Sequence, residues 1–564
     1  MSALLILLVA VVLLALGYVF YGSWLAKQWG VDPNRETPAH TSYDGMDFVP
    51  ANPAVLMGHH FSSIAGAGPI NGPIQAAVFG WVPVFLWCVF GGIFFGAMHD
   101  FGALFASIRH NGGSIGQIMK DSMGVKAQRL FIVFALAVLI LVIASFTAVV
   151  AGTFVSVDPS APTYAANGAT AMTSILFIVI AAIFGFFVYR KNAKIGPATV
   201  IGIIGIIAIV FLGQEIGLHF SRTFWVLFIA VYVTVASLLP VWILLQPRDY
   251  LSSFLLYGMM GLALIAIIGG SFTGVAVVQV PAFTGLVNAA GQPIFPFLFI
   301  TVACGACSGF HSLISSGTSS KQINNEKDAQ IIGYGSMVIE SALGVIALIA
   351  VGVVWNLVGD KYQMSAPPTI FAGGIATMFD SFVHGSYSTI YNLFTLAVSV
   401  FALTSLDSAT RLCRYLFAEL LTPEGKTHDD LTGAAKFFST PIVSTLIMVV
   451  IGCGMGFMGL SQIWSVFGAA NQLLAGVAML AVCTWLGKIG RNNKMFFFPM
   501  VFMLCATITA LCFTIVKGFA TIAAGAQWGT YFQVIWSIAL VVLAVVLAVM
   551  SFKTLSAQAK SKKA

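Results

Sequence analysis

Long apolar runs recur along the whole chain, and short polar stretches or Gly and Pro residues separate them. An α-helix of about 20 mostly apolar residues crosses the hydrocarbon core of a bilayer. Runs of about this length predict fifteen transmembrane helices, at 3–26, 52–78, 82–108, 130–156, 170–189, 196–214, 223–245, 252–280, 295–318, 330–358, 387–408, 439–458, 462–486, 495–516 and 530–552.

Composition supports a membrane protein. Hydrophobic residues make up 59% of the 564 residues and charged residues only 8%, whereas soluble domains average about 25% charged residues. So few charges cannot cover a water-facing surface, which argues against aqueous enzymes, nucleic-acid-binding proteins and disordered scaffolds. The predicted fold class is an all-α polytopic membrane protein, with residues 1–564 forming one membrane domain. The run at 3–26 is interpreted as an ordinary first helix, because it lacks a basic start and a small-residue cleavage site.

The basic residues predict the orientation. If the amino terminus is outside and the segments alternate, all but three of the 26 Lys and Arg residues fall inside. Cytoplasmic loops carry such an excess, so we predict a multi-pass protein of the cytoplasmic (inner) membrane with a cytoplasmic carboxyl terminus. The stretch 359–386 would then be outside, as a short helix that lies along the interface or re-enters the membrane as a lid.

The predicted second span contains the sequence GHHFSSIAGAGPINGP at 58–73. Proline removes a backbone donor and clashes with the preceding turn, and non-helical backbone at membrane depth is tolerated where it lines a wet cavity or is buried in protein. Broken helices of this kind form binding sites in secondary transporters. The alternative is a Gly-rich packing seam with a kink. The predicted substrate-binding residues here are His59, His60, Ser62, Ser63, Gly66 and Gly68.

The predicted ninth span contains ACGACSGFHSLISSGTSSKQI at 303–323. Its hydroxyl groups could coordinate Na⁺ or bind a carboxylate, or they could only bond back to helix carbonyls. We assign Ser308 and His311 to the substrate and Ser315, Ser316 and Thr318 to a coupling cation. Cys304 and Cys307 are spaced as CxxC, but no second pair stands at metal spacing, so we expect ordinary packing and no metal site.

Three carboxylates lie within predicted spans, namely Asp100, Glu340 and Asp407. A buried carboxylate is costly in lipid and often marks a proton relay or an ion pathway, so all three are candidates for cation coupling. For Asp407 a structural ion pair with Arg411, one helical turn later, is slightly favoured. Glu340 has no cation in its own span, which favours a functional role.

Several blocks together resemble the carbon-starvation (CstA-type) transporter family. They are VLMGHHFSSIAGAGPINGP (55–73), GAMHDFGALFASIRHNGGSIG (96–116), QPRDYL (246–251), the 303–323 block, IGYGSMVIES (332–341), FALTSLDSATRLCRYLFAE (401–419) and WSVFGAANQLLAG (464–476). The resemblance implies a symporter that takes up pyruvate or small peptides when carbon is limiting.

The same resemblance implies membership of the amino acid–polyamine–organocation superfamily and a LeuT-like inverted repeat of five plus five helices, with extra helices at both ends. Residues 1–50 would be the first helix and a loop, 51–220 the first repeat, 221–420 the second repeat, and 437–553 additional helices. The span at 223–245, interrupted at 237–240, would be the broken partner of the span at 52–78.

The predicted function is therefore secondary active, cation-coupled uptake of a small carboxylate such as pyruvate, with H⁺ favoured. A di- or tripeptide substrate and Na⁺ coupling stay open, whereas a channel or a membrane redox subunit fits less well. No P-loop is present, so ATP-driven transport is disfavoured. We expect no enzymatic activity, no cofactor beyond the coupling ion, and no nucleic-acid partner; the partners are the small-molecule substrate and the lipid bilayer, and the sequence leaves the oligomeric state open.

Overall fold

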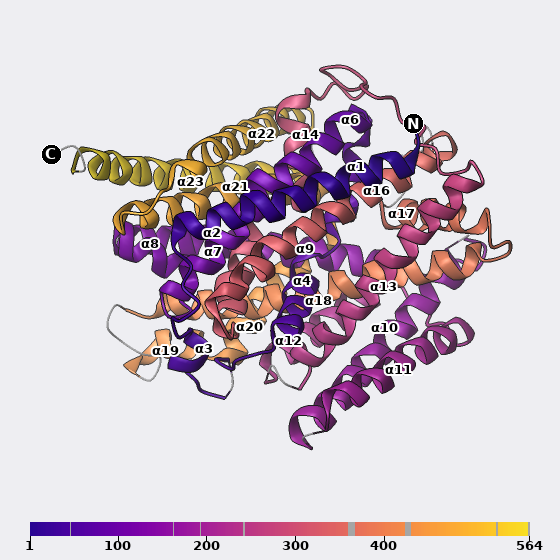
Figure 1. Ribbon diagram of the computed structural model, residues 1–564, viewed down its shortest axis with the longest axis horizontal. Helices are drawn as coiled ribbons and strands as arrows, with labels where there is room; N and C mark the ends of the chain where they lie inside the picture. The colour runs from indigo at the N-terminus through magenta and orange to yellow at the C-terminus, as the bar shows by residue number, and fades with distance from the viewer. Residues whose placement is uncertain are drawn as a thin grey trace.

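A computed structural model describes residues 1–45, 47–161, 163–191, 193–240, 243–358, 367–423, 430–458, 460–525 and 528–561. Helices are the only extended regular structure in these residues, and the β-pairing within them is limited to three isolated bridges. The chain therefore has the all-α fold that the sequence predicts (Figure 1).

Thirteen helices in the described residues are long and apolar enough to cross a membrane. They correspond to thirteen of the fifteen predicted spans. The other two predictions fall on a shorter apolar helix at Arg222–Leu238 and on the interrupted segment at 53–76. The polytopic membrane fold is confirmed, and the number of spans stays a prediction.

The first third of the chain comprises α1 (Ala3–Leu16), η1 (Gly17–Gly22), α2 (Ser23–Trp29), α3 (Pro38–Thr41), α4 (Pro53–Ile64), α5 (Gly68–Ala76), η2 (Ala77–Phe79), α6 (Trp81–Leu86), η3 (Trp87–Ala97), α7 (Met98–Arg109), α8 (Ile115–Met123) and α9 (Val125–Phe154). The middle third comprises α10 (Tyr164–Gly185), η4 (Phe186–Arg190), α11 (Ile195–Glu215), α12 (Arg222–Leu238), α13 (Leu245–Phe272), α14 (Ile294–Val302), η5 (Ala303–Gly305), α15 (Gly309–Gly317), η6 (Ser319–Lys321), η7 (Glu326–Asp328), η8 (Gln330–Gly335) and α16 (Ser336–Val358). The last third comprises α17 (Pro367–Asp380), α18 (Tyr387–Leu421), α19 (Gly433–Ser439), α20 (Pro441–Met455), η11 (Gly456–Met458), α21 (Leu460–Lys488), η12 (Lys494–Phe496), α22 (Phe497–Ala523) and α23 (Trp528–Ser561).

The predicted second span is a broken helix. Helix α4 ends at Ile64, the chain leaves helical geometry at Ala65 (ψ 58°), and α5 begins at Gly68 with a proline in its first turn. Proline suits the first helical turn, where its missing N–H has no helical partner to lose. The non-helical segment is short, covering residues 65–67, and Ser63 still belongs to α4.

The span at 223–245, predicted as the partner of this broken helix, is formed by α12 and the chain that follows it. Helix α12 continues to Leu238, and Pro240 follows its end instead of interrupting it, because a residue before proline is driven to extended geometry. The second interruption lies in the ninth span, where α14 ends at Val302 and α15 begins at Gly309. The inverted repeat of five plus five helices, with the span at 223–245 as the partner, stays a prediction.

The two broken helices pack directly against each other. A side chain at Gly72 of α5 would overlap the backbone carbonyl of Val302 at the end of α14, and one at Gly68 would overlap the side chain of Cys304. Glycine is therefore required at Gly72 for the two backbones to approach this closely. This contact brings the two unusual segments of the sequence together in the middle of the protein.

The predicted outer stretch contains a buried helix. Most of α17 is buried, including Phe371, and α17 packs against α16, α18, α13 and α5. It is therefore surrounded by protein on several sides, and its position relative to the membrane stays a prediction. Residues 359–366 of the predicted lid, and Lys361 with them, lie outside the described residues.

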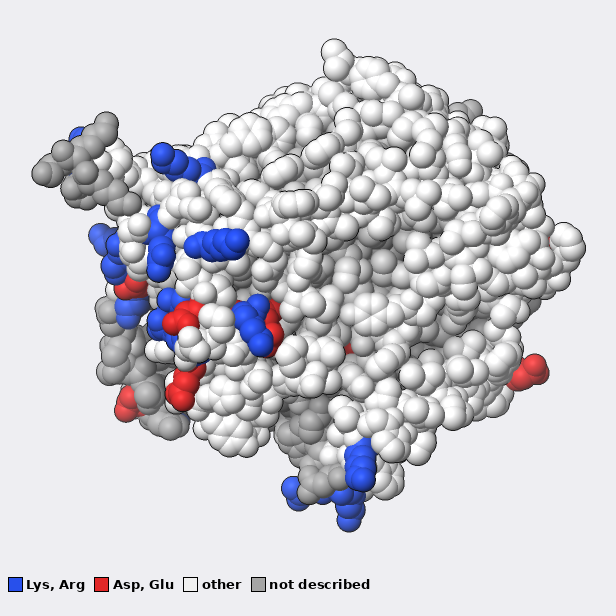
Figure 2. Space-filling model, viewed as in Figure 1, with Lys and Arg blue, Asp and Glu red and all other residues white. Residues whose placement is uncertain are grey.

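Charge is distributed unevenly over the face shown in Figure 2. Lys and Arg side chains gather at the end of the molecule near α2, α8 and the carboxyl terminus and at the lower edge where α11 begins, while the upper and right-hand parts are almost uncharged. The two chain termini lie at opposite ends in Figure 1. The predicted orientation would place these basic regions on the cytoplasmic side.

Reporter fusions test that orientation. We expect cytoplasmic signals from fusions after Arg129, Lys194, Lys327 and Lys494, and external signals from fusions near Ser160 and Gly291, measured with a paired phosphatase and fluorescent-protein assay. A third outer point, Gly459, lies outside the described residues. Two or more reversed signals would contradict the predicted orientation.

Candidate functional site

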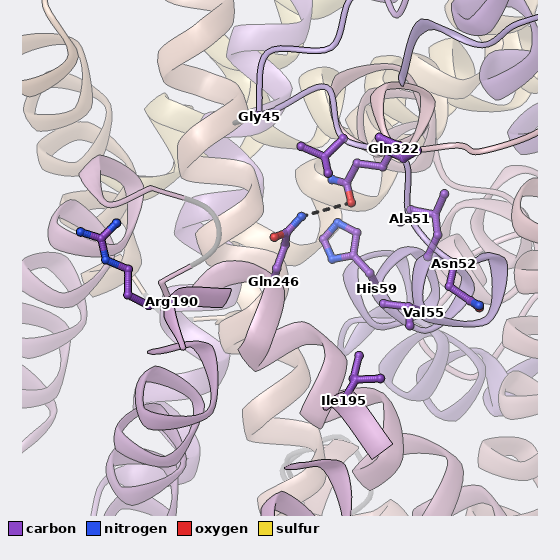
Figure 3. A pocket seen from close by; sticks show the side chains of 12 residues that line it. Gly45, Ala51, Asn52, Val55, His59, Arg190, Ile195, Gln246 and Gln322 are labelled. Atoms are coloured by element: carbon purple, nitrogen blue, oxygen red, sulfur yellow. Dashed lines mark hydrogen bonds between the residues drawn. The ribbon is translucent and has the colours of Figure 1, made fainter. Parts of the chain in front are cut away.

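A cavity of about 440 Å³ opens beside the amino-terminal half of the first broken helix (Figure 3). It lies between the loop before α4, the start of α13 and the chain after α15. Gln246 donates a hydrogen bond to Gln322 across it (3.4 Å). The lining residues are Gly45, Val49, Pro50, Ala51, Asn52, Val55, Leu56, His59, Arg190, Ile195, Gln246 and Gln322.

His59 is the polar residue of α4 that reaches this cavity. Its side chain is buried, and Nδ1 lies 3.1 Å from Oδ2 of Asp249 in α13. Both ring nitrogens are buried, and neither makes a hydrogen bond. Ser63 donates a hydrogen bond to the same Asp249 oxygen (3.3 Å), and Ser62 donates to the backbone carbonyl of Asp249 (3.0 Å). The predicted residues of α4 are thus tied to α13 next to the helix break.

Arg248 continues this array toward α18. Its guanidinium donates to Oδ1 of Asp249 (2.9 Å) and to the hydroxyl of Tyr232 (2.8 Å), and it forms an ion pair with Asp407. Tyr232 in turn donates to Asp407 (2.7 Å). Arg248, Asp249 and Asp407 are all at least 98% buried. The guanidinium of Arg248 therefore links the Asp249 carboxylate of α13 to the Asp407 carboxylate of α18.

The predicted pairing of Asp407 with Arg411 is wrong. Arg411 donates instead to the carbonyl oxygens of Ala236 (2.9 Å) and Leu239 (2.6 Å) at the end of α12. The last carbonyls of a helix have no partner within the helix, so a nearby guanidinium satisfies them. Asp407 is left to Arg248, which comes from a different helix.

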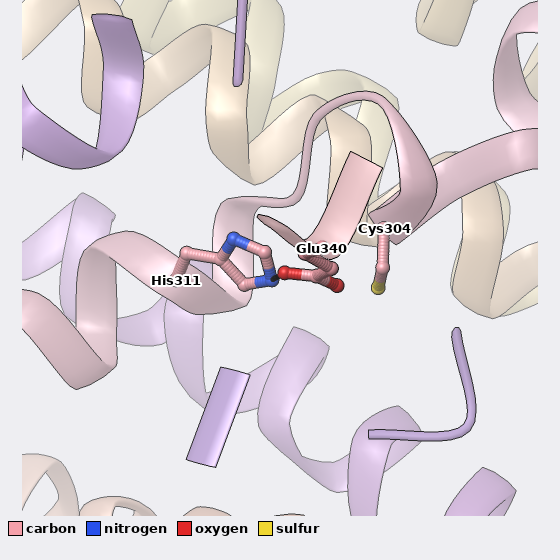
Figure 4. Close-up of side chains that lie close together, drawn as sticks. All are labelled: Cys304, His311 and Glu340. Atoms are coloured by element: carbon pink, nitrogen blue, oxygen red, sulfur yellow. Dashed lines mark ion pairs between the residues drawn. The ribbon is translucent and has the colours of Figure 1, made fainter. Parts of the chain in front are cut away.

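A second, fully buried polar cluster connects the second broken helix to α7 and α16 (Figure 4). Asp100 bonds to Nδ1 of His99 and to Nδ1 of His311, each at 2.7 Å. On the other side of its ring, Nε2 of His311 lies 3.5 Å from Oε2 of Glu340. All four side chains are fully buried. The predicted coupling residues Asp100 and Glu340 are therefore joined through a predicted substrate residue, His311.

The ligand atoms of Cys304, His311 and Glu340 lie within 4.8 Å of one another (Figure 4). The Cys304 sulfur also contacts the Ser308 hydroxyl (3.4 Å) and the Asn471 side-chain nitrogen (3.6 Å). Because neutral protein partners already surround the thiol, we assign no metal to this cluster. Cys307 does not belong to it, so the CxxC spacing does not describe the arrangement.

Asn471 of α21 supports the second helix break. Its side-chain oxygen accepts a hydrogen bond from the backbone N–H of Phe310 (2.9 Å), and its nitrogen donates to Ser308 (3.0 Å). The first N–H groups of a helix have no helical partner, and Asn471 satisfies one at the start of α15. Ser308 is thus held at the break, but outside the cavity lining.

The remaining predicted residues have separate environments. Nδ1 of His60 lies 2.7 Å from the hydroxyl of Ser319, Ser316 donates back to the carbonyl of Ser312 (2.7 Å), and the Ser315 hydroxyl is buried without a partner. Thr318 lines a smaller neighbouring cavity. Gly66 faces Ser405, which donates to the Ser63 carbonyl (3.3 Å), and Gly68 faces Cys304.

Sequence reasoning did not single out Arg248, Asp249, Tyr232 or Asn471. A signal existed for the first two, because an adjacent Arg–Asp pair precedes a long apolar helix in the block QPRDYL. Tyr232 and Asn471 give no such signal, since a single polar side chain in an apolar helix often only forms a hydrogen bond to a neighbouring helix.

Comparisons with known proteins agree with this architecture. A peptide transporter CstA of Campylobacter jejuni is 34% identical to the chain, covering 90% of the chain and 79% of that protein. A pyruvate/proton symporter BtsT of Escherichia coli is 30% identical, covering 90% and 81% respectively. A solved manganese transporter of Eremococcus coleocola, in a mutant form, has the same fold over 91% of the chain and 99% of its own, with a TM-score of 0.52 at 10% identity.

The family described as carbon starvation protein CstA matches residues 2–370 and 356–510. Together these regions cover most of the chain, including both broken helices and both polar clusters. The chain therefore belongs to the carbon starvation protein CstA family of membrane transporters.

Proposed function

We propose that the protein is a proton-coupled symporter that takes up a small carboxylate such as pyruvate across the cytoplasmic membrane. The observation that supports this most is the chain of buried groups His99, Asp100, His311 and Glu340 beside the paired broken helices. Buried ionisable groups inside a membrane protein are costly, and they typically belong to proton relays or ion pathways.

His311 is the centre of the proposed relay. Its Nδ1 bonds to Asp100, so Nδ1 carries a proton and Nε2 faces Glu340. Without another proton, a nitrogen lone pair would face a carboxylate whose two oxygens have no hydrogen-bond partner, which is unfavourable in a buried site. A proton on either His311 or Glu340 removes this conflict. The cluster can thus hold a proton that does not come from the substrate.

Proton coupling supplies the driving force that an anionic substrate requires. At a membrane potential of about 100 mV, each net positive charge moved inward contributes about 2.3 kcal/mol. This energy supports a concentration ratio of roughly fiftyfold, since each 1.4 kcal/mol is a factor of ten. Two protons carried with one pyruvate would move one such net charge.

Two alternatives follow from specific observations. The family includes proteins named peptide transporters, and a 440 Å³ cavity is large enough for a small peptide. Na⁺ could replace H⁺ if the unpartnered hydroxyl of Ser315 and its neighbours supplied oxygen ligands.

Reconstitution in liposomes separates these possibilities. With an imposed inward proton gradient, we expect labelled pyruvate to accumulate, the accumulation to collapse with a protonophore, and replacement of Na⁺ by K⁺ on both sides to have little effect. Liposomes without protein are the control. Accumulation that survives the protonophore but requires Na⁺ would contradict proton coupling, and uptake of labelled dipeptide but not pyruvate would contradict the proposed substrate.

A further inference from the structure

We propose that Asn471 of α21 is a positioning residue for proton coupling, which holds the first turn of α15 so that His311 stays between Asp100 and Glu340. The inference rests on the proposed function, because it concerns the relay of that function. It adds a residue from a helix that contributes no side chain to the relay, and it predicts that the neighbouring Gln472 does not share this role.

Helix α21 lies against both halves of the second broken helix, α14 and α15. Two glycines allow this close approach. A side chain at Gly468 of α21 would overlap the carbonyl oxygen of Ile300 in α14, and one at Gly309 of α15 would overlap the carbonyl oxygen of Asn471. The backbones of α21 and α15 therefore touch at the point where α15 begins.

Two consecutive residues of α21, both fully buried, satisfy backbone groups on opposite sides of the break. Asn471 accepts a hydrogen bond from the N–H of Phe310 (2.9 Å), at the start of α15. Gln472 donates to the carbonyl oxygen of Phe299 (2.6 Å), in the last turn of α14. The first N–H groups and the last carbonyl groups of a helix have no partner within the helix. Each half-helix is therefore supported by a different residue of α21.

The backbone of the break itself is strained. Ala303, the first residue after α14, has a φ of 43°, which residues with a Cβ rarely adopt. Such a conformation persists only where the surrounding contacts hold it. Asn471 supplies contacts of this kind, because its side-chain nitrogen donates to the Ser308 hydroxyl (3.0 Å) and lies 3.6 Å from the Cys304 sulfur. Removal of the Asn471 side chain would therefore allow the break to relax.

The groups that Asn471 contacts lead directly to the relay. His311 follows Phe310 in the chain, and both lie in the first turn of α15. The His311 ring bonds to Asp100 at 2.7 Å on one side and lies 3.5 Å from Glu340 on the other (Figure 4). Asp100 and Glu340 come from α7 and α16, so a shift of α15 changes both distances. A shift of about 1 Å would take the His311–Asp100 pair out of hydrogen-bonding range, which ends near 3.2 Å.

Gln472 offers a matched control. It is as deeply buried as Asn471 and bonds to the same broken helix, but its partner Phe299 lies on the other side of the break from His311. The Phe299 carbonyl also accepts a hydrogen bond from the indole N–H of Trp87 (3.3 Å), so Gln472→Ala leaves it with a partner. We therefore expect Gln472→Ala to lower thermal stability without changing proton coupling.

Transport in liposomes tests the positioning role. Two quantities are measured for each variant: accumulation of labelled pyruvate under an imposed inward proton gradient, and exchange of labelled for unlabelled pyruvate without a gradient. A smaller amount of folded protein lowers both alike, whereas a displaced His311 lowers accumulation more. We expect the ratio of accumulation to exchange to fall at least about tenfold in Asn471→Ala, because a buried N–H loses its partner, and to stay within about twofold in Gln472→Ala.

Hydrogen–deuterium exchange, followed by mass spectrometry, gives a readout that does not require transport. In the purified full chain in detergent, we expect peptides that cover residues 304–316 to exchange faster in Asn471→Ala, since the Phe310 N–H has lost its acceptor. The same peptides should be unchanged in Gln472→Ala. Unchanged deuterium exchange in Asn471→Ala, or equal ratios of accumulation to exchange in the two variants, would overturn the positioning role.

Asn471→Leu provides a second variant, because leucine fills a similar volume but makes no hydrogen bond, and we expect the same two results from it. Gel filtration and thermal unfolding establish whether each variant is folded. If neither variant of Asn471 folds while Gln472→Ala does, Asn471 is a general structural support and the positioning role is wrong. Failure of the proposed function looks different: the unmodified protein would show no proton-driven accumulation, while the difference in deuterium exchange between the Asn471 and Gln472 variants would remain.

Discussion

Replacing Asp100 by Asn or Glu340 by Gln is expected to abolish proton-driven accumulation of pyruvate for at least one of the two variants. Each substitution keeps the size of the side chain and removes its titration. Asp100 and Glu340 flank His311 on opposite sides of its ring, so each substitution removes one of the two carboxylates that could exchange a proton with this histidine. Uptake into liposomes under an imposed proton gradient measures the loss, which should reach background.

Exchange of labelled for unlabelled pyruvate across the membrane serves as the internal control. Exchange does not require net proton movement. Relative to the unmodified protein, a folded variant that lacks the relay should therefore lose less of its exchange activity than of its accumulation activity. If both variants accumulate pyruvate normally, the relay is not the coupling site. Uptake that then depends on Na⁺ would assign coupling to the hydroxyl groups around Ser315.

Replacing Arg248 by Met is expected to cause the largest loss of stability. The substitution leaves Asp249 and Asp407 buried without their shared cation. Breaking a buried ion pair by removing one partner costs about 3–5 kcal/mol, and here two carboxylates lose a partner. Thermal unfolding in detergent, followed by fluorescence or by loss of the monodisperse peak, measures the effect.

Two further variants give this experiment its contrast. Lys488→Met breaks the pair of Lys488 with Asp121, in which both side chains are almost half exposed, so the expected cost is at most about 1 kcal/mol. The hydrogen bond from Lys488 lowers the pKa of Asp121, so this pair is charged at neutral pH. Both Arg248→Met and Lys488→Met therefore remove the cation of a charged pair, one buried and one partly exposed. Adding Asp407→Asn to Arg248→Met should recover part of the lost stability. A similar loss for Arg248→Met and Lys488→Met would contradict the proposed structural role.

The sequence predicted the class of fold and the first broken helix well, because hydropathy and proline act locally. The second break was not predicted. No proline lies between Val302 and Gly309, and the interruption is supported instead by Asn471, about 160 residues away along the chain. Local patterns do not contain such long-range hydrogen bonds. The assignment of 223–245 as the broken partner stays a prediction, since a proline marks the end of a helix such as α12 as readily as a kink.

The candidate site was predicted in part. Residues were chosen because polar groups are rare in apolar runs, and this rule identified His59, Asp100, His311 and Glu340. This rule does not predict which of these side chains contact one another, because the contacts depend on how the helices pack. Asp407 illustrates the limit: Arg411 is its neighbour in the helix, but Arg248 from another helix is its partner.

The backbone contact between Gly72 and Val302 has a mechanical consequence. With no side chain between them, the backbones of α5 and α14 lie in direct contact, so we expect these two half-helices to move together. The non-helical joints, residues 65–67 and 306–308, are then the places where we expect the two helices to bend if the cavity at His59 closes. His59 lies in α4, before the first joint, and His311 lies in α15, after the second joint. Bending at the joints would therefore move these two residues relative to α5 and α14.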